Sequence, residues 1–164
     1  MKGFDMKLRL IAAGKIKERS LRDAAAEYVK RLSSFCTLEI AEVPDEKTPE
    51  HAPEAIERKI KEIEGKRLLA KVPGKSFLIV LAIEGRALSS EELAGKLSEL
   101  MLRGQSDISI LIGGSLGVSE EVLQRADFLL SFSRMTFPHQ LMRLIALEQL
   151  YRSFKINAGE PYHK

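Results

Sequence analysis

A short apolar run that ends on two glycines, Ile108-Ser-Ile-Leu-Ile-Gly-Gly114, constrains the fold of this chain most. Such a run is typical of a strand that is buried on both faces, and the glycines predict an open turn after it. In open α/β sheets, ligands bind just beyond the carboxyl ends of the strands, where glycine lets the backbone approach them closely. A glycine pair alone is more often a tight turn than a ligand floor. Its position after a buried strand leaves both interpretations equally open.

Strand and helix patterns alternate along the whole chain. Apolar or alternating segments predict five strands, at 8–14, 37–43, 77–83, 108–112 and 128–132. Apolar residues at three-and-four spacing predict five helices, at 20–32, 54–71, 90–103, 120–125 and 138–155. This order predicts an α/β fold with a mostly parallel sheet and helices on both faces. Because segment 37–43 alternates apolar and polar residues, we expect it near a sheet edge.

Several residues predict where helices begin and end. Ser20 and Ser89 are suitable N-caps, and Gly104 is a suitable C-terminal glycine. Pro138 suits the first position of the last helix. Gly65 weakens the middle of the 54–71 segment and predicts that it splits in two.

Length and composition limit the class of protein. With 164 residues, 45% hydrophobic and 30% charged, the chain is expected to form one soluble domain. It contains no run near the roughly 18–20 apolar residues of a membrane span. Met1–Asp5 lacks the apolar core of a signal peptide and is interpreted as an extension before a domain at 6–164. The single cysteine, Cys36, excludes an intrachain disulfide and a cysteine-cluster metal site. We expect a cytoplasmic protein.

The amino-terminal part of the chain is basic. Residues 1–35 carry nine Lys or Arg against four Asp or Glu, although the whole chain has a net charge of only +3. A basic lobe of this kind indicates a phosphate-rich partner, and the simpler interpretation is a solubilising surface. The side chains that such a partner would contact include Lys15, Lys17, Arg19 and Arg22.

The last helix has more apolar positions than one core face requires. They are Leu141, Met142, Leu144, Ile145, Leu147, Leu150, Tyr151 and Phe154. The excess predicts a partner surface, for which a symmetric homodimer is the commonest solution. The alternative is a helix at the centre of the monomer.

The histidines carry little chemistry by spacing alone. His139, in the first turn of the last helix, is interpreted as a structural hydrogen-bonder, and His51 as a surface residue. His163 lies in the polar ending Pro161-Tyr-His-Lys164, which is either a frayed terminus or a flap over an active site. The histidines lack metal-ligand spacing, so no metal is expected. The glycine pair fits neither a dinucleotide fingerprint nor a P-loop.

Several separated motifs, in order, resemble one enzyme family. They are 110–117 (ILIGGSLG), 130–143 (LSFSRMTFPHQLMR), 148–152 (EQLYR) and the final YHK. Together they resemble the ribosomal large-subunit pseudouridine N3-methyltransferases, the H-type enzymes of the SPOUT class. The resemblance covers residues 6–164.

The resemblance implies a parallel α/β sheet whose C-terminal segment forms a trefoil knot, an exception to the usual unknotted topology. It implies homodimers that bind S-adenosyl-L-methionine in the knot and methylate N3 of a pseudouridine in helix 69 of 23S rRNA, on the assembled ribosome. The cofactor contacts would fall on Leu81, Gly113, Phe132, Ser133, Arg134, Met135, Thr136 and Phe137. Tyr162, His163 and Lys164 would act on the substrate side, near the partner subunit's cofactor.

The implied reaction suits the residues at hand. Methyl transfer is an in-line displacement that depends mainly on alignment, and N3 must lose a weakly acidic proton. His163 could take that proton, and Lys164 or Arg143 could stabilise the negative charge. Two alternatives remain. A non-enzymatic RNA-binding factor would use the same basic lobe, whereas a small α/β hydrolase is disfavoured because no nucleophile elbow is present.

Overall fold

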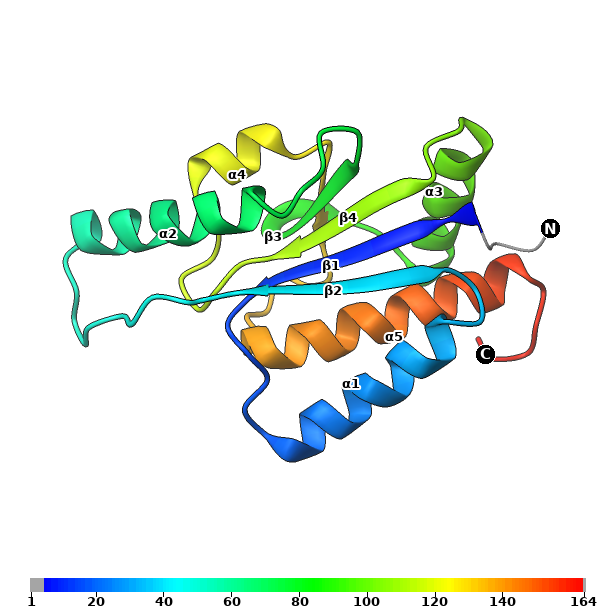
Figure 1. Cartoon of the computed structure of the whole chain (residues 1–164), viewed down its shortest axis with the longest axis horizontal. Coiled ribbons are helices and arrows are strands. Elements are labelled where there is room, and N and C mark those ends of the chain that lie inside the picture. Colours follow the sequence, from blue (N-terminus) through cyan, green and yellow to red (C-terminus); the bar gives the residue numbers. More distant parts are fainter. Residues whose placement is uncertain (1–4, 164) are drawn as a thin grey trace.

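The computed structural model describes residues 5–163, which form one five-stranded parallel sheet flanked by helices (Figure 1). The strands are β1 (Lys7–Ala13), β2 (Thr37–Val43), β3 (Phe77–Ala87), β4 (Asp107–Ile112) and β5 (Phe128–Ser131). The helices are α1 (Arg19–Leu32), α2 (Glu54–Leu69), α3 (Ser90–Leu102), α4 (Glu120–Arg125) and α5 (His139–Asn157). The predicted α/β class is confirmed. Of the expected extension Met1–Asp5, all but Asp5 lies outside the described residues.

The strand order is β2-β1-β4-β3-β5, and every pairing is parallel. The apolar strand β4 lies at the centre, between β1 and β3, and its buried side chains confirm the predicted burial of this strand. The predicted edge position of β2 is confirmed, and half-exposed Ile40 lies on this edge strand. Because all strands run the same way, their carboxyl ends gather at one edge of the sheet.

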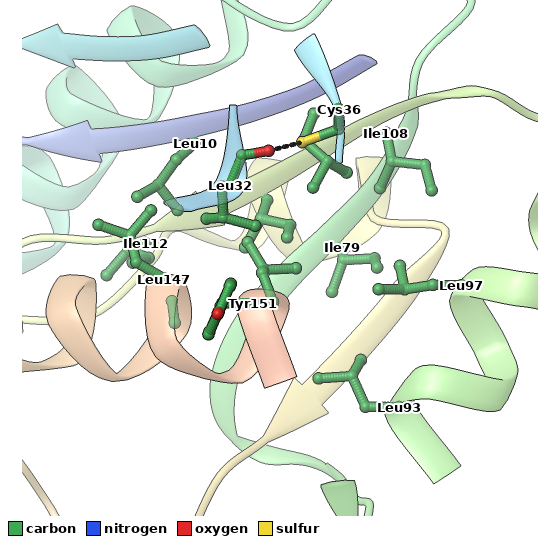
Figure 2. Packing of buried hydrophobic residues seen from close by; sticks show 14 of the residues in the cluster. Leu10, Leu32, Cys36, Ile79, Leu93, Leu97, Ile108, Ile112, Leu147 and Tyr151 are labelled. Atoms are coloured by element: carbon green, nitrogen blue, oxygen red, sulfur yellow. Dashed lines mark hydrogen bonds between the residues drawn. The ribbon is translucent and has the colours of Figure 1, made fainter. Parts of the chain in front are cut away.

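Alternate side chains of the strands point to two separate cores. Leu10, Ile79 and Ile108 point to the face covered by α1, α3 and α5, where Leu97 and Leu147 meet them (Figure 2). The residues between them point to the other face, toward α2 and α4, and form a smaller cluster that contains Ile11, Val80, Leu111, Leu68 and Val122. Figure 1 shows α2 and α4 on one side of the sheet and α1 and α5 on the other.

Cys36 belongs to the larger core, as its sequence context predicts. Its Sγ donates to the carbonyl of Leu32 at 3.6 Å, an interaction drawn in Figure 2. Burial raises the pKa of the Cys36 thiol to about 12, so the thiolate is disfavoured at neutral pH and the residue acts as a small apolar side chain.

Two helix predictions are wrong. Ser20 does not cap α1, because the helix begins at Arg19 and Glu18 occupies the cap without a side-chain hydrogen bond. Gly65 does not split α2, which is continuous from Glu54 to Leu69. A Cβ on Gly65 would lie 2.4 Å from the hydroxyl of Ser119, so this glycine is required by a close contact. Propensity is overridden by packing here.

Other helix boundaries follow their signals. Ser89 caps α3 through a complete capping box with Glu92. Gly104 follows α3 with φ +80°, as a C-terminal glycine should. Pro138 occupies the N-cap of α5 with extended ψ, one position before the predicted place, and the helix begins at His139.

β3 is longer than predicted. Leu81 pairs with Leu130, and then a register shift lets Arg86 pair with Leu130 and Ala87 with Ser131. A Cβ on Gly85, within the shift, would lie 2.8 Å from the backbone of β5. Glycine therefore permits two backbone segments to touch at this point.

Most of the apolar surface of α5 is buried within the chain itself. Leu147, Leu150, Tyr151 and Phe154 are all buried, and α5 packs against both α1 and α3. Leu141, Met142, Leu144 and Ile145 are half-buried. Of these, Met142 and Leu144 pack against the larger core, which leaves Leu141 and Ile145, one helical turn apart. The position of α5 as a central helix of the monomer thus accounts for most of its excess apolar positions. The homodimer stays a prediction, and it now depends on the face formed by Leu141 and Ile145.

No helix among the described residues is long and apolar enough to cross a membrane. Within residues 5–163, no cluster of His, Cys, Asp and Glu has an arrangement that could hold a metal ion.

Candidate active site

A cleft of about 320 Å³ opens at the carboxyl ends of β3, β4 and β5. Three segments line most of it. They are the middle of β3 from Leu81 to Glu84, where its pairing with β5 shifts register, the glycine loop Ile112–Val118 after β4, and the stretch Leu130–Phe137 from the end of β5 toward α5. Its volume lies in the range of about 300–1,000 Å³ typical of small-molecule sites. The fold therefore joins the two stretches singled out in the sequence.

The glycine loop is a tight, well-defined floor. The N–H of Gly117 donates to the carbonyl of Gly114 at 3.0 Å, and Gly117 has φ +94°. A Cβ on Gly113 would lie 2.6 Å from the carbonyl oxygen of Gly117. The pair Gly113–Gly114 is thus part of a tight turn and also lines the cleft. The sequence had left a tight turn and a ligand floor as alternatives, and the two are compatible.

The wall after β5 is held by short side-chain bonds to the backbone. The hydroxyl of Ser131 donates to the carbonyl of Ser133 at 3.0 Å. The hydroxyl of Ser133 in turn accepts the N–H of Met135 at 3.0 Å. These bonds fold the segment over the cleft while Met135 stays 72% exposed.

Seven of the eight predicted cofactor residues line this cleft. They are Leu81, Gly113, Phe132, Ser133, Met135, Thr136 and Phe137. Arg134 is exposed and is not among the lining residues.

The cleft also contains side chains that the sequence did not single out as site residues. Ile83, Leu116 and Met142 add apolar surface, and Lys61 and Glu84 bring one charge of each sign. Lys61 comes from α2, in a segment with no motif of its own, so only its place in the fold brings it to the cleft. Ile83 is 52% exposed and adds apolar surface to the mouth of the cleft.

His139 lines the cleft as well, at the first residue of α5. Burial lowers the pKa of its imidazole, and the nearby charges of Arg143 and Lys17 act in the same direction, against an opposing effect of Asp45. The imidazole is therefore neutral at pH 7, and the role of His139 as a structural hydrogen-bonder stays a prediction.

The tail does not reach the cleft of its own chain. His163 lies between α3 and α5. Its Nε2 is 2.6 Å from the carboxylate of Glu91, and its Nδ1 is 3.1 Å from the guanidinium of Arg152. Tyr162 stacks edge-on against Tyr151, with ring centroids 4.9 Å apart, and donates to Glu148 at 3.2 Å. Residues 142 and 152 of α5 are separated by about 15 Å of helix, so the tail lies well away from the part of α5 that lines the cleft. Lys164 lies outside the described residues.

Arg143 lies apart from the other residues predicted to be catalytic. Its guanidinium is buried, donates to the carbonyl of Gly14 at 3.1 Å and pairs with Glu42 at 2.6 Å. It faces the β1–β2 side of α5, whereas Met142 faces the cleft. Within one chain, the structure does not bring Arg143 together with Tyr162 and His163.

The basic segment lies beside the cleft. Lys15, Lys17, Arg19 and Arg22 are all exposed and follow the carboxyl end of β1. The N–H of Lys17 donates to Gln140 in the first turn of α5 at 2.9 Å, which ties this segment to the helix that begins at the cleft.

Comparisons with known proteins agree with this arrangement. The family described as "Predicted SPOUT methyltransferase" matches residues 6–163. A protein of Bifidobacterium adolescentis is 60% identical over 159 residues, which are 97% of this chain and all of that protein. Relatives from Carboxydothermus hydrogenoformans and Clostridioides difficile are 57% and 55% identical over the same length. All three carry the name ribosomal RNA large subunit methyltransferase H.

Solved structures of lower sequence similarity share the fold. A probable methyltransferase from Bordetella pertussis has a TM-score of 0.59 at 14% identity, covering 94% of this chain and 99% of that one. A probable methylase from Haemophilus influenzae has a TM-score of 0.53 at 14% identity, covering 98% and 71%. At this identity the likeness concerns the fold alone.

Proposed function

Because this chain belongs to the SPOUT methyltransferase family, we propose that it methylates large-subunit ribosomal RNA with S-adenosyl-L-methionine as the methyl donor. The observation that carries the proposal is the cleft at the carboxyl ends of β3, β4 and β5, in a chain with full-length relatives named as such enzymes. An enzyme with this substrate works in the cytoplasm, where ribosomes are found.

The lining of the cleft fits this cofactor. Leu81, Phe132 and Phe137 offer apolar surface to an adenine ring, and the backbone of the glycine loop offers polar groups without phosphate-binding geometry. Lys61 and Glu84 provide one charge of each sign for a zwitterionic amino-acid group. When bound, the cofactor supplies an activated methyl group on a sulfonium.

We place the acceptor at N3 of a pseudouridine in helix 69 of 23S rRNA, as the family resemblance implies. The protein must hold that nitrogen in line with the methyl group and accept its proton. His163 is the proposed base, as the family resemblance implies. In the isolated chain its Nδ1 accepts from Arg152 and its Nε2 faces Glu91, so it must release Arg152 to take a proton from the substrate. Tyr162 and Lys164 complete the proposed substrate side.

The position of the tail supports a composite site in a homodimer. His163 lies near the end of α5 that is distant from the cleft of its own chain, so a tail that acts on substrate would serve the cleft of a partner subunit. Leu141 and Ile145 form the candidate contact face on α5. We infer also that the segment after β5 forms the trefoil knot of this family around the glycine loop, because the two segments line one cleft.

One pair of measurements tests the enzyme. Calorimetry should show S-adenosylmethionine or its demethylated product binding to the purified protein. Mass mapping of 23S rRNA from a deletion strain should show one methyl group missing from helix 69, restored by the gene. If neither ligand binds at millimolar concentration, the non-enzymatic RNA-binding factor is the remaining explanation. If the ligands bind but the rRNA is unchanged, the substrate is wrong.

A further inference from the structure

A second cavity, of about 300 Å³, lies on the other side of α5 from the cofactor cleft. It is enclosed by the segment after β1, the helix α1, the edge strand β2 and the first half of α5. Most of its wall is apolar and includes Ala25, Val29 and Leu147, and four charged side chains also line it. These are Lys15, Arg22, Glu42 and Arg143.

Arg143 is a buried cation in the wall of this cavity. The residue is only 4% exposed, and its two terminal nitrogens are engaged by Gly14 and Glu42. Its Nε is fully buried and has no hydrogen-bond partner in the described part of the chain. Buried guanidinium donors are almost always satisfied, so this guanidinium has hydrogen-bonding capacity that the described protein atoms leave unused.

The charges around the cavity favour an anionic acceptor. Glu42 is its one acidic lining residue and already pairs with Arg143. Lys15 and Arg22 form no ion pair among residues 5–163; Arg22 reaches only the carbonyl of Lys17, at 3.4 Å. The three cationic side chains and the single carboxylate of Glu42 leave an excess of positive charge in the cavity. A bound oxyanion would neutralise this charge, whereas water would not.

We propose that this second cavity binds a phosphate group, with Arg143 at its base and Lys15 and Arg22 at its entrance. Arg provides planar, directed donors that match phosphate oxygens, and Lys adds a mobile point charge. The group is either a backbone phosphodiester of the RNA substrate or a free phosphate. The first source rests on the proposed function, because α5 carries His139 on the cofactor side and Arg143 on this side. A bound phosphodiester would then fix the strand beside the methyl-transfer site.

The basic segment offers a matched control for the experiment. The double variant Lys15→Gln with Arg22→Gln removes two charges that line the cavity. The double variant Lys17→Gln with Arg19→Gln removes two charges from the same segment that do not line it. Both control side chains are exposed, and Arg19 forms only a surface pair with Asp23 at 3.7 Å. Circular dichroism confirms that each full-length variant is folded.

Inorganic phosphate is the first probe, titrated by calorimetry against chloride at equal ionic strength. Wild type and the Lys17/Arg19 variant should bind phosphate saturably with the same affinity, and the Lys15/Arg22 variant at least about tenfold more weakly. No saturable binding, or equal losses in the two variants, overturns the site in favour of diffuse screening.

Ribosomes are the second probe. If RNA is the source of the phosphate, the Lys15/Arg22 variant raises KM for the ribosomal substrate about tenfold and leaves S-adenosylmethionine affinity unchanged. Specific phosphate binding with an unchanged KM assigns the site to free phosphate. If wild type binds phosphate specifically but transfers no methyl group, the phosphate site is supported and the proposed enzyme is refuted. Failure of the phosphate site and failure of the proposed function therefore give different results.

Discussion

The carboxylate of Glu64 occupies the space that a side chain at Gly114 would need. A Cβ on Gly114 would lie 2.8 Å from Oε1 of Glu64, and Oε2 of the same carboxylate accepts the N–H of Glu46 at 2.9 Å. The next residue, Gly65, makes room in return for Ser119 at the far end of the glycine loop. Helix α2 thus fits against both ends of the loop that forms the floor of the cleft.

Gly114→Ala should displace this loop. The new methyl group overlaps a buried carboxylate held by a backbone hydrogen bond, and overpacking of this kind costs about 1–3 kcal/mol of unfolding free energy. We expect S-adenosylmethionine affinity to fall at least tenfold, measured by calorimetry beside a thermal melt. Gly74→Ala is the control, because a Cβ there meets nothing within 4 Å. Unchanged affinity in Gly114→Ala would separate the loop from cofactor binding.

Glu64→Gln should change how stability depends on pH. Burial, with Asp45 and Glu46 nearby, raises the pKa of Glu64 above its ordinary value of 4.5, against the effects of the Glu46 N–H and of Arg67. The folded state then binds this proton more tightly than the unfolded chain, so stability falls as the pH rises from 4.5 through the raised value. The Gln variant should gain melting temperature relative to wild type between pH 4.5 and 7. If the difference in melting temperature between the Gln variant and wild type stays constant over this range, the pKa of Glu64 is not raised by folding.

Affinity for S-adenosylmethionine should fall as His139 becomes protonated. Burial lowers the pKa of His139 below its ordinary value of 6.5, so the imidazole gains charge only below that pH. The resulting cation would repel the sulfonium of the cofactor, whereas the demethylated product lacks that charge. We expect calorimetry from pH 7.5 to 5.5 to show a larger loss for the cofactor than for the product, and His139→Gln to remove the difference.

Deletion of Pro161–Lys164 should abolish methylation and leave cofactor affinity nearly intact. The tail contacts Glu91, Glu148 and Arg152, none of which lines the cleft of its own chain. Transfer of a labelled methyl group to ribosomes measures the first effect and calorimetry the second. Full activity of the truncated protein would exclude the tail from the reaction.

Two substitutions on α5 should separate the core from the proposed dimer face. Leu150 is 2% exposed, so Leu150→Asp buries an unpaired carboxylate and should cost more than about 4 kcal/mol of unfolding free energy. Ile145 is half-buried, so Ile145→Asp should leave the fold intact and yield monomers. Sedimentation reports the oligomeric state. A stable Ile145→Asp dimer would remove this face from the interface.

Much of the arrangement could be predicted because it depends on local patterns. The continuous apolar character of β4 predicted a buried strand, and the alternation of β2 predicted a strand at the edge. The motif that ends at Gly114 and the stretch from Phe132 to Phe137 were both predicted to belong to one binding site, and both line the cleft.

Other features follow from contacts between segments that lie far apart in the sequence. Gly65 has a low helix propensity, yet α2 continues through it because Ser119 packs where a side chain would be. Arg143 belongs to a motif that resembles an active site, but its partners are Gly14 and Glu42, more than a hundred residues away.

The sequence by itself determined the order of strands and helices, their buried faces and the two stretches that form the cleft. Residue periodicity and glycine conformation act within a few positions of the chain, so these features can be seen in the sequence. Only the tertiary structure decided which side of α5 His139 and Arg143 face, which brings His139 to the cleft and Arg143 to the second cavity. That outcome depends on how α5 packs between α1 and α3, and no short segment specifies this packing.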